Sequence, residues 1–288
     1  MKNLNYQLKQ LCHFNRDGSY GTQAGRSRML SLMANQLVSL GYRRMNAHSL
    51  KPKHVIALTK LWNTQSISIG TQKNRLSALR WWAKKINKQN VVARDNRAYG
   101  IGSRTFVTNY SKSQELDRYK LTKIHDPHIR LSLKLQAAFG LRREEAIKFQ
   151  PKYAIQDDHI KLKSSWCKGG RARTVPIAND EQRRLLTEVD AFAKGGSLIH
   201  PLMTYVQQLH RYEGQTLRAG FSKLHGLRHS YAQRRFEELA GFLCPATGGP
   251  TSKELTPEQR ALNEKARAMI SAELGHSREA ITAVYLGR

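Results

Sequence analysis

Positive charge runs through the first third of this chain with almost no negative charge to balance it. Residues 1–110 hold 19 Lys and Arg but only two acids, Asp17 and Asp95, which gives 19 − 2 = +17. Residues 111–288 hold 30 basic and 19 acidic residues, or +11. So large an excess repels itself in a compact state unless the working partner is a polyanion. The charge lies in apolar-patterned sequence and not in a tail, so we expect a folded basic surface.

The three cysteines, Cys12, Cys167 and Cys244, are far apart and form no Cys-x-x-Cys or Cys/His pattern. This spacing suggests neither a zinc site nor a disulfide framework and is typical of a reducing compartment. The chain begins with polar residues rather than an export signal, and it has no apolar run of 18 residues. We therefore expect no bound metal, no membrane span and a cytoplasmic location.

Apolar residues recur at helical spacing in three segments of the N-terminal part. The first runs from Met29 to Leu40 and stops at Gly41, the second spans about Pro52 to Trp62, and the third opens at Thr71. Residues 1–25 predict an arm or a short helix. The helical period is lost over residues 89–112, so we place a linker near 105–112 and expect domains at 1–110 and 111–288.

The second domain is expected to be mainly α-helical with a small β component. Segment Asp126–Phe139 fits both a strand and a helix, whereas residues 159–163 and 173–177 predict two short strands around a Gly-Gly turn. Thr256-Pro257-Glu258-Gln259 is a capping box with proline at the first helical position. Further helices are expected at Gln114–Thr122 and at residues 180–194, 201–212, 223–240 and 257–274.

Four motifs of this domain carry side chains suited to phosphate chemistry. They are Gly140-Leu141-Arg142 with Glu145, Cys167-Lys168-Gly169-Gly170, His225-Gly226-Leu227-Arg228-His229, and Leu274-Gly275-His276 with Tyr285 nine positions later. Two planar guanidinium groups form a natural clamp for phosphate oxygens, and a tyrosine hydroxyl can act as a nucleophile. Taken singly, Gly-Leu-Arg is more often a capped surface helix and His-x-x-Arg is more often structural. Solvated basic loops are ordinary, and a tyrosine at a chain end is as often a packing residue.

In this order, Arg142, Lys168, His225, Arg228, His276 and Tyr285 resemble the catalytic set of the tyrosine recombinases, the phage-integrase family. The resemblance covers residues 112–288 by motif and residues 26–110 by charge and helical pattern only. It implies an N-terminal helical, SAM-like DNA-binding domain and a mixed α/β catalytic domain, and it favours a helix at Asp126–Phe139. It also implies site-specific DNA recombination through a 3′-phosphotyrosyl intermediate, without metal, ATP or another cofactor.

The resemblance assigns a role to each residue. Tyr285 would attack phosphorus and His225 would help to move its proton, while Lys168 would protonate the 5′-leaving oxygen. Arg142, Arg228 and His276 would hold the phosphate, with Glu145 supporting them from behind and His229 structural. The implied partners are double-stranded attachment sites in a bacterial cytoplasm, a homotetramer on DNA, and accessory DNA-bending or excision factors.

Seven further basic side chains are candidates for DNA binding. Because almost no acid lies near them, the N-terminal ones fit phosphate contact better than a merely solvated face. They are Lys73, Arg75, Arg80, Lys84 and Lys88 in the third N-terminal helix, and Arg171 and Arg173 beside the Gly-Gly turn.

Two features depart from the family pattern. His225 and His276 are 51 positions apart, which is more than is common in the family, and the excess lies near Gly241–Leu255. We interpret residues 241–256 as a surface loop insertion. Only three residues follow Tyr285, too few for the helix that docks on a neighbouring protomer in many relatives. The insertion is therefore a candidate for protomer contacts.

Two alternatives stay open at this point. A type IB topoisomerase-like enzyme would use the same chemistry to relax supercoils as a monomer. A non-catalytic basic DNA-binding protein would keep the positive surface without needing the six residues.

Overall fold

The computed structural model describes residues 3–276 and 278–288 and separates the chain into two compact units between Thr105 and Phe106. Each unit has its own hydrophobic core. No helix of the described residues has the length and apolar character needed to cross a membrane.

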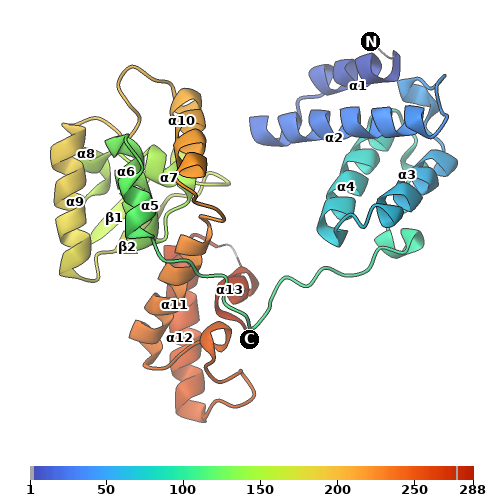
Figure 1. Ribbon diagram of the computed structural model, residues 1–288. Helices are drawn as coiled ribbons and strands as arrows, with labels where there is room; N and C mark the ends of the chain where they lie inside the picture. The colour runs from blue at the N-terminus through green and yellow to red at the C-terminus, as the bar shows by residue number, and fades with distance from the viewer. Residues whose placement is uncertain (1–2, 277) are drawn as a thin grey trace. The chain divides into compact units, whose positions relative to one another are not determined.

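The N-terminal unit is a helical bundle of α1 (Asn3–Phe14), α2 (Tyr20–Ser39), α3 (Pro52–Thr64) and α4 (Ile69–Lys85), drawn in blue to cyan in Figure 1. Trp62 and Trp82 are fully buried in its core. Their indole N–H groups donate to Gln36 Oε1 at 3.0 Å and to the Ala47 carbonyl at 2.8 Å, so the polar atoms of both rings are satisfied. Of the two forms expected for residues 1–25, the structure has the helical one: α1 and the start of α2.

The C-terminal unit contains a two-stranded antiparallel sheet, in which β1 (His159–Leu162) pairs with β2 (Arg173–Pro176). Ile160 and Leu162 of β1 and Val175 of β2 are buried. The surrounding helices are α5 (Arg118–Thr122), α6 (Pro127–Phe139), α7 (Arg143–Ile147), α8 (Pro151–Ala154), α9 (Asp180–Ala193), α10 (Tyr205–Arg218), α11 (Gly226–Ala240), α12 (Pro257–Glu273) and α13 (Glu279–Leu286). The structure confirms the mainly α fold with a small β component, the helix at α6 and the capping box at the start of α12.

The helix expected at Gln114–Thr122 is wrong in its first half. The carboxylate of Asp117 accepts from Lys120 N at 2.9 Å and caps a helix that begins only at Arg118. The backbone N–H of Gln114 instead donates to the Gly226 carbonyl at 3.0 Å. Contact with α11, which has no local sequence signal, keeps residues 114–117 out of the helix.

The expectation of a surface loop at residues 241–256 is also wrong for its first part. Cys244, Pro245 and Ala246 are buried, and Cys244 and Ala246 belong to the main core of the C-terminal unit. A 3₁₀ turn at Pro245–Thr247 packs against α13. Small apolar side chains allow this close approach, and only residues 252–254 form a fully exposed stretch.

Candidate active site

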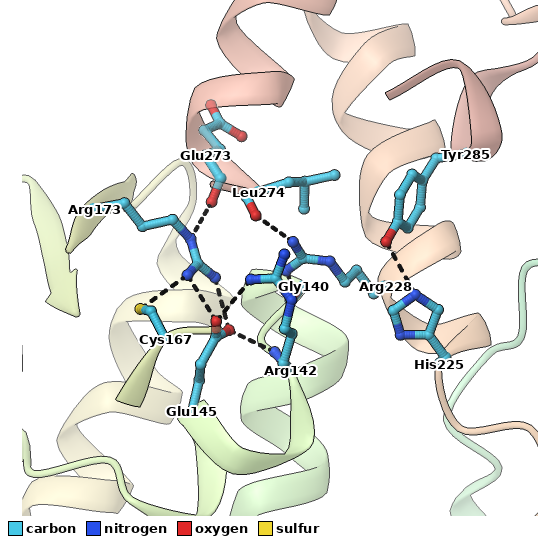
Figure 2. Close-up of polar contacts among 10 residues, drawn as sticks. All are labelled: Gly140, Arg142, Glu145, Cys167, Arg173, His225, Arg228, Glu273, Leu274 and Tyr285. Atoms are coloured by element: carbon cyan, nitrogen blue, oxygen red, sulfur yellow. Dashed lines mark hydrogen bonds and ion pairs between the residues drawn. The ribbon is translucent and has the colours of Figure 1, made fainter. Parts of the chain in front are cut away.

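Glu145 and Arg173 form a buried ion pair at the base of the site (Figure 2). Glu145 lies in the first turn of α7 and Arg173 at the start of β2. The two side chains bond in a forked arrangement, with Nη1 to Oε1 at 2.8 Å and Nη2 to Oε2 at 2.7 Å. Burial would raise the pKa of Glu145, but the hydrogen bonds and charge of Arg173, with those of Arg228 and Arg142, lower it to about 2. The carboxylate therefore stays ionised.

Arg142 uses the same carboxylate to fix its own position. Its backbone N–H donates to Glu145 Oε2 at 2.7 Å and its Nη1 donates to Oε1 at 2.9 Å. The first of these bonds is a capping interaction at the start of α7, because Arg142 directly precedes its first turn. About a quarter of the Arg142 side chain, 23 %, stays exposed, so donor groups remain for an incoming anion.

Arg173 corrects one of the candidates for DNA binding. Its side chain is only 5 % exposed, and besides Glu145 it donates from Nε to the Glu273 carbonyl at 2.7 Å and from Nη1 to Cys167 Sγ at 3.2 Å. A side chain held so completely lies below the surface that DNA would touch. Strand alternation could have revealed this, since Arg173 and the buried Val175 lie two positions apart and face the same way.

Arg228 is the most deeply placed of the three arginines, with 1 % of its surface exposed. Nη1 donates to the Gly140 carbonyl and Nη2 to the Leu274 carbonyl, so one guanidinium joins the loop before α7 to the end of α12. Its Nε is buried without a partner. Burial and then the charge of Arg142 lower the pKa of Arg228 to about 10, which leaves it cationic at neutral pH.

Tyr285 and His225 meet at their polar atoms. The Tyr285 hydroxyl, on α13, lies 3.0 Å from Nε2 of His225, the residue before α11, although the two residues are 60 positions apart in sequence. Tyr285 is 6 % exposed, whereas His225 remains open to solvent on its outer side. Burial of the ring, followed by the charges of Arg228 and Arg142, lowers the pKa of His225 below its usual value. The imidazole is therefore neutral at pH 7 and can accept a proton.

Two more histidines enclose the Tyr285 ring. His276 stacks on it with ring centroids 5.2 Å apart, and His229 lies 4.4 Å away on a tilted plane. His276 Nδ1 is 3.0 Å from the hydroxyl of Thr282, a residue not singled out from the sequence. Its Nε2 is buried without a partner, so this nitrogen is free to bond to a ligand. The histidine that was expected to be structural, His229, packs directly on the tyrosine.

Lys168 is not joined to the other five residues. It is exposed in the connection between β1 and β2, and within the described chain no side chain or backbone group forms a hydrogen bond or ion pair with it. Gly169 and Gly170 follow with positive φ angles of 78° and 68° and open space at their Cα atoms. Lys168 thus lies in a turn built from glycines, one residue from Cys167 and its contact with Arg173.

The other candidates for DNA binding are unequally available. Arg80 donates to the Ala93 carbonyl and to Asn96, and Lys88 donates to the His48 carbonyl at 2.6 Å. Arg75 lies over the Trp62 ring at 5.3 Å. Lys84 and Arg171 are exposed and Lys73 is half-buried. Arg80 and Lys88 therefore serve the fold of the N-terminal unit, whatever further contact they make.

The site as a whole presents cationic groups around a buried hydroxyl. Arg142 and Arg173 pair with the one carboxylate, of Glu145, and Arg228 has no acidic partner among the described residues, which leaves an excess of two positive charges beside Tyr285 and three neutral imidazoles. Such an arrangement suits an anion that carries its charge on several oxygens, because Arg142 and Arg228 keep N–H groups for it. A neutral histidine at the hydroxyl supplies the base that a weak nucleophile needs.

Comparison with known protein families gives two matches. A family model described as phage integrase, N-terminal, matches residues 1–92, and one described as integrase matches residues 102–234. No curated protein sequence matches the chain.

Solved structures share the fold at low sequence identity. A XerH site-specific recombinase bound to difH DNA is 17 % identical with a TM-score of 0.61, covering 99 % of this chain and 81 % of that one. A lambda integrase dimer on a core site is 14 % identical with a TM-score of 0.62, covering 99 % and 78 %. The Tn1549 transposon integrase with circular intermediate DNA is 15 % identical with a TM-score of 0.53, covering 100 % and 96 %.

Proposed function

We propose that this chain, which belongs to the phage-integrase family of tyrosine recombinases and catalyses site-specific DNA recombination, cuts DNA with Tyr285. The tyrosine oxygen would attack the phosphorus of one phosphodiester and displace the 5′-oxygen of the next nucleotide. The strand would then be held as a 3′-phosphotyrosyl bond. Attack by the free 5′-hydroxyl of another strand would reverse the step and release Tyr285, so that the number of phosphoester bonds is conserved.

His225 accepts the Tyr285 proton in this proposal. An ordinary tyrosine has a pKa near 10 and is a weak nucleophile at neutral pH. Nε2 of His225 lies 3.0 Å from the hydroxyl, within the reach required of a general base. This distance, between two residues 60 positions apart, is the observation that carries the proposal.

The arginines stabilise the charge that develops on the phosphate. Arg142 and Arg228 would each donate to a non-bridging oxygen, and His276 would donate from its unpartnered side of the ring. Glu145 and Arg173 would hold this set in place without touching DNA. Lys168, exposed beside Gly169 and Gly170, would protonate the departing 5′-oxygen when DNA draws the turn inward.

The partner is double-stranded DNA. A lambda integrase is described as a tetramer bound to a Holliday junction, and we propose the same number of protomers here. We also propose attachment sites as substrates, a cytoplasmic location and assistance by accessory DNA-bending or excision factors. Neither a topoisomerase-like enzyme nor a non-catalytic binder is favoured by the two integrase-family matches.

A suicide-substrate assay tests the nucleophile. DNA nicked close to the cleavage point releases a short fragment, which traps the covalent complex on a denaturing gel. Tyr285→Phe should abolish the adduct and leave DNA affinity unchanged, because one hydroxyl adds little to a charge-dominated interface. Tyr119→Phe, a change at a tyrosine that is 70 % exposed, is the control and should form the adduct normally. An adduct with Tyr285→Phe would remove this residue from the mechanism.

A further inference from the structure

Residues 106–116, here called the joining segment, connect the N-terminal unit to the rest of the C-terminal unit. We propose that Asn109 and Ser111 of the joining segment are positioning residues that set the Tyr285 hydroxyl against His225. The inference rests on the proposed role of Tyr285 as nucleophile and extends it to residues outside the family-like motifs.

Asn109 holds the chain just beyond Tyr285 at two points. Its Nδ2 donates to the Arg288 carbonyl at 3.0 Å, and its Oδ1 accepts from the Arg288 N–H at 3.0 Å. Gly287, with a φ angle of 76°, lies between the end of α13 and Arg288. A Cβ at position 287 would lie 2.6 Å from Asn109 Oδ1 and 2.9 Å from Ala246 N, so only glycine permits the chain to pack this closely against Asn109.

Ser111 reaches Tyr285 through one intermediate side chain. Its hydroxyl donates to Gln233 Oε1 at 2.9 Å, and Gln233 Nε2 donates to the Tyr285 carbonyl at 2.9 Å. Gln233 is 6 % exposed on α11. The amide orientation of Gln233 is therefore fixed by Ser111, and it holds the backbone of the nucleophile itself.

The joining segment also contacts the residue next to His225, the proposed base for Tyr285. Gln114 N donates to the Gly226 carbonyl at 3.0 Å, next to His225. A Cβ at Gly226 would lie 2.6 Å from the Gln114 side chain and 2.9 Å from the Lys112 carbonyl. The start of α11 and the residues after α13 thus both form hydrogen bonds with the joining segment.

The length of α13 explains why these contacts matter. It has eight residues, far fewer than the roughly 12–15 that make an isolated helix marginally stable, so tertiary contacts must set its position. A displacement of about 1 Å at a reacting atom can cost on the order of 100-fold in rate.

Single-turnover cleavage by the full chain tests the proposal, since it separates the rate from the fraction of active protein. Asn109→Ala/Ser111→Ala should slow cleavage about 10- to 100-fold while the reaction still reaches the parent amplitude. DNA affinity should change less than about twofold, because neither residue is charged. Asn109→Asp combined with Ser111→Ala keeps the acceptor for the Arg288 N–H, so this variant should cleave faster than Asn109→Ala/Ser111→Ala. Asn90→Ala/Ser252→Ala, at two exposed positions, is the matched control and should cleave like the parent.

Two outcomes would overturn the inference. One is cleavage by the double variant at the parent rate. The other is a lower amplitude at the parent rate, which would mean that the residues only support folding. Tyr285→Phe is run beside them: an adduct from that protein removes the proposed nucleophile, whereas its absence together with parent-like cleavage by the double variant removes the positioning role alone.

Discussion

The hydroxyl oxygen of Tyr285 lies 3.0 Å from Nε2 of His225, and burial together with two arginines keeps the pKa of that histidine below its usual value. The proposed nucleophile and its proposed base are therefore in direct contact. The histidine is in the neutral form that can accept a proton, so the pair needs no titration to become competent at neutral pH.

The pH dependence of cleavage should follow this pair. A base works in its neutral form, so cleavage at subsaturating DNA should fall toward acidic pH with a midpoint below about 6.5, the ordinary value of a histidine. His225→Gln should lose about 10²- to 10⁴-fold in rate and lose the acidic limb of the profile. His210→Gln, a change at an exposed histidine, should keep both the parent rate and the acidic limb of the profile. A parent profile with its midpoint above about 6.5 would contradict the assignment.

Glu145 should matter most for stability. Its folded pKa of about 2 lies below the unfolded value, so its contribution is present above about pH 4.5 and is lost as pH falls toward 2. Glu145→Gln leaves Arg173 buried without an opposite charge and should cost on the order of 3–5 kcal/mol at pH 7. The difference in the free energy of unfolding between Glu145→Gln and the parent, measured by chemical unfolding, should become smaller below about pH 4.5.

A surface acid serves as the control for this experiment. Glu188 pairs with Lys134 at 2.8 Å but is half exposed, so Glu188→Gln should cost about 0–1 kcal/mol. If Glu145→Gln and Glu188→Gln lose the same free energy of unfolding, the buried network around Glu145 stabilises the fold no more than a surface ion pair does.

The sequence predicted most of the side chains that lie together around Tyr285, but not the buried Glu145–Arg173 pair beneath them. Arg142, His225, Arg228, His276 and Tyr285 were recognisable because their chemistry and order are distinctive, and the structure brings them together. Arg173 was misassigned since its charge suggested a surface position, and only the strand alternation with Val175 pointed inward. A charged side chain is buried when a partner neutralises it, and the partner, Glu145, lies 28 residues away.

The positioning contacts had no sequence signal at all. Asn109 and Ser111 are ordinary linker residues, and their partners are 179 and 122 positions away. Hydrogen bonds between polar side chains and distant backbone depend on the assembled fold rather than on a periodic pattern. The same holds for residues 114–117, where a tertiary bond replaced the expected helix.

Arg171 and Arg173 should respond differently to salt. Arg171 is exposed, so Arg171→Ala should reduce the slope of log affinity against log salt by about one if it neutralises a phosphate. Arg173→Met should leave the slope unchanged and lower the free energy of unfolding by about 3–5 kcal/mol, because it removes the fully buried partner of Glu145 and leaves that carboxylate only Arg142. Fluorescence anisotropy at several salt concentrations measures the slopes. A smaller slope with Arg173→Met would restore it as a DNA contact.

The insertion gives the last prediction. A flexible Gly-Ser linker of equal length in place of residues 242–251 removes Cys244, Pro245 and Ala246 from beneath α13. Adduct formation on a single site should therefore fall, because the helix that carries Tyr285 loses one of its supports. The same treatment of residues 252–254, which are exposed, should leave single-site cleavage intact. If the larger replacement cleaves a single site normally and weakens only the pairing of two sites, the insertion acts between protomers instead.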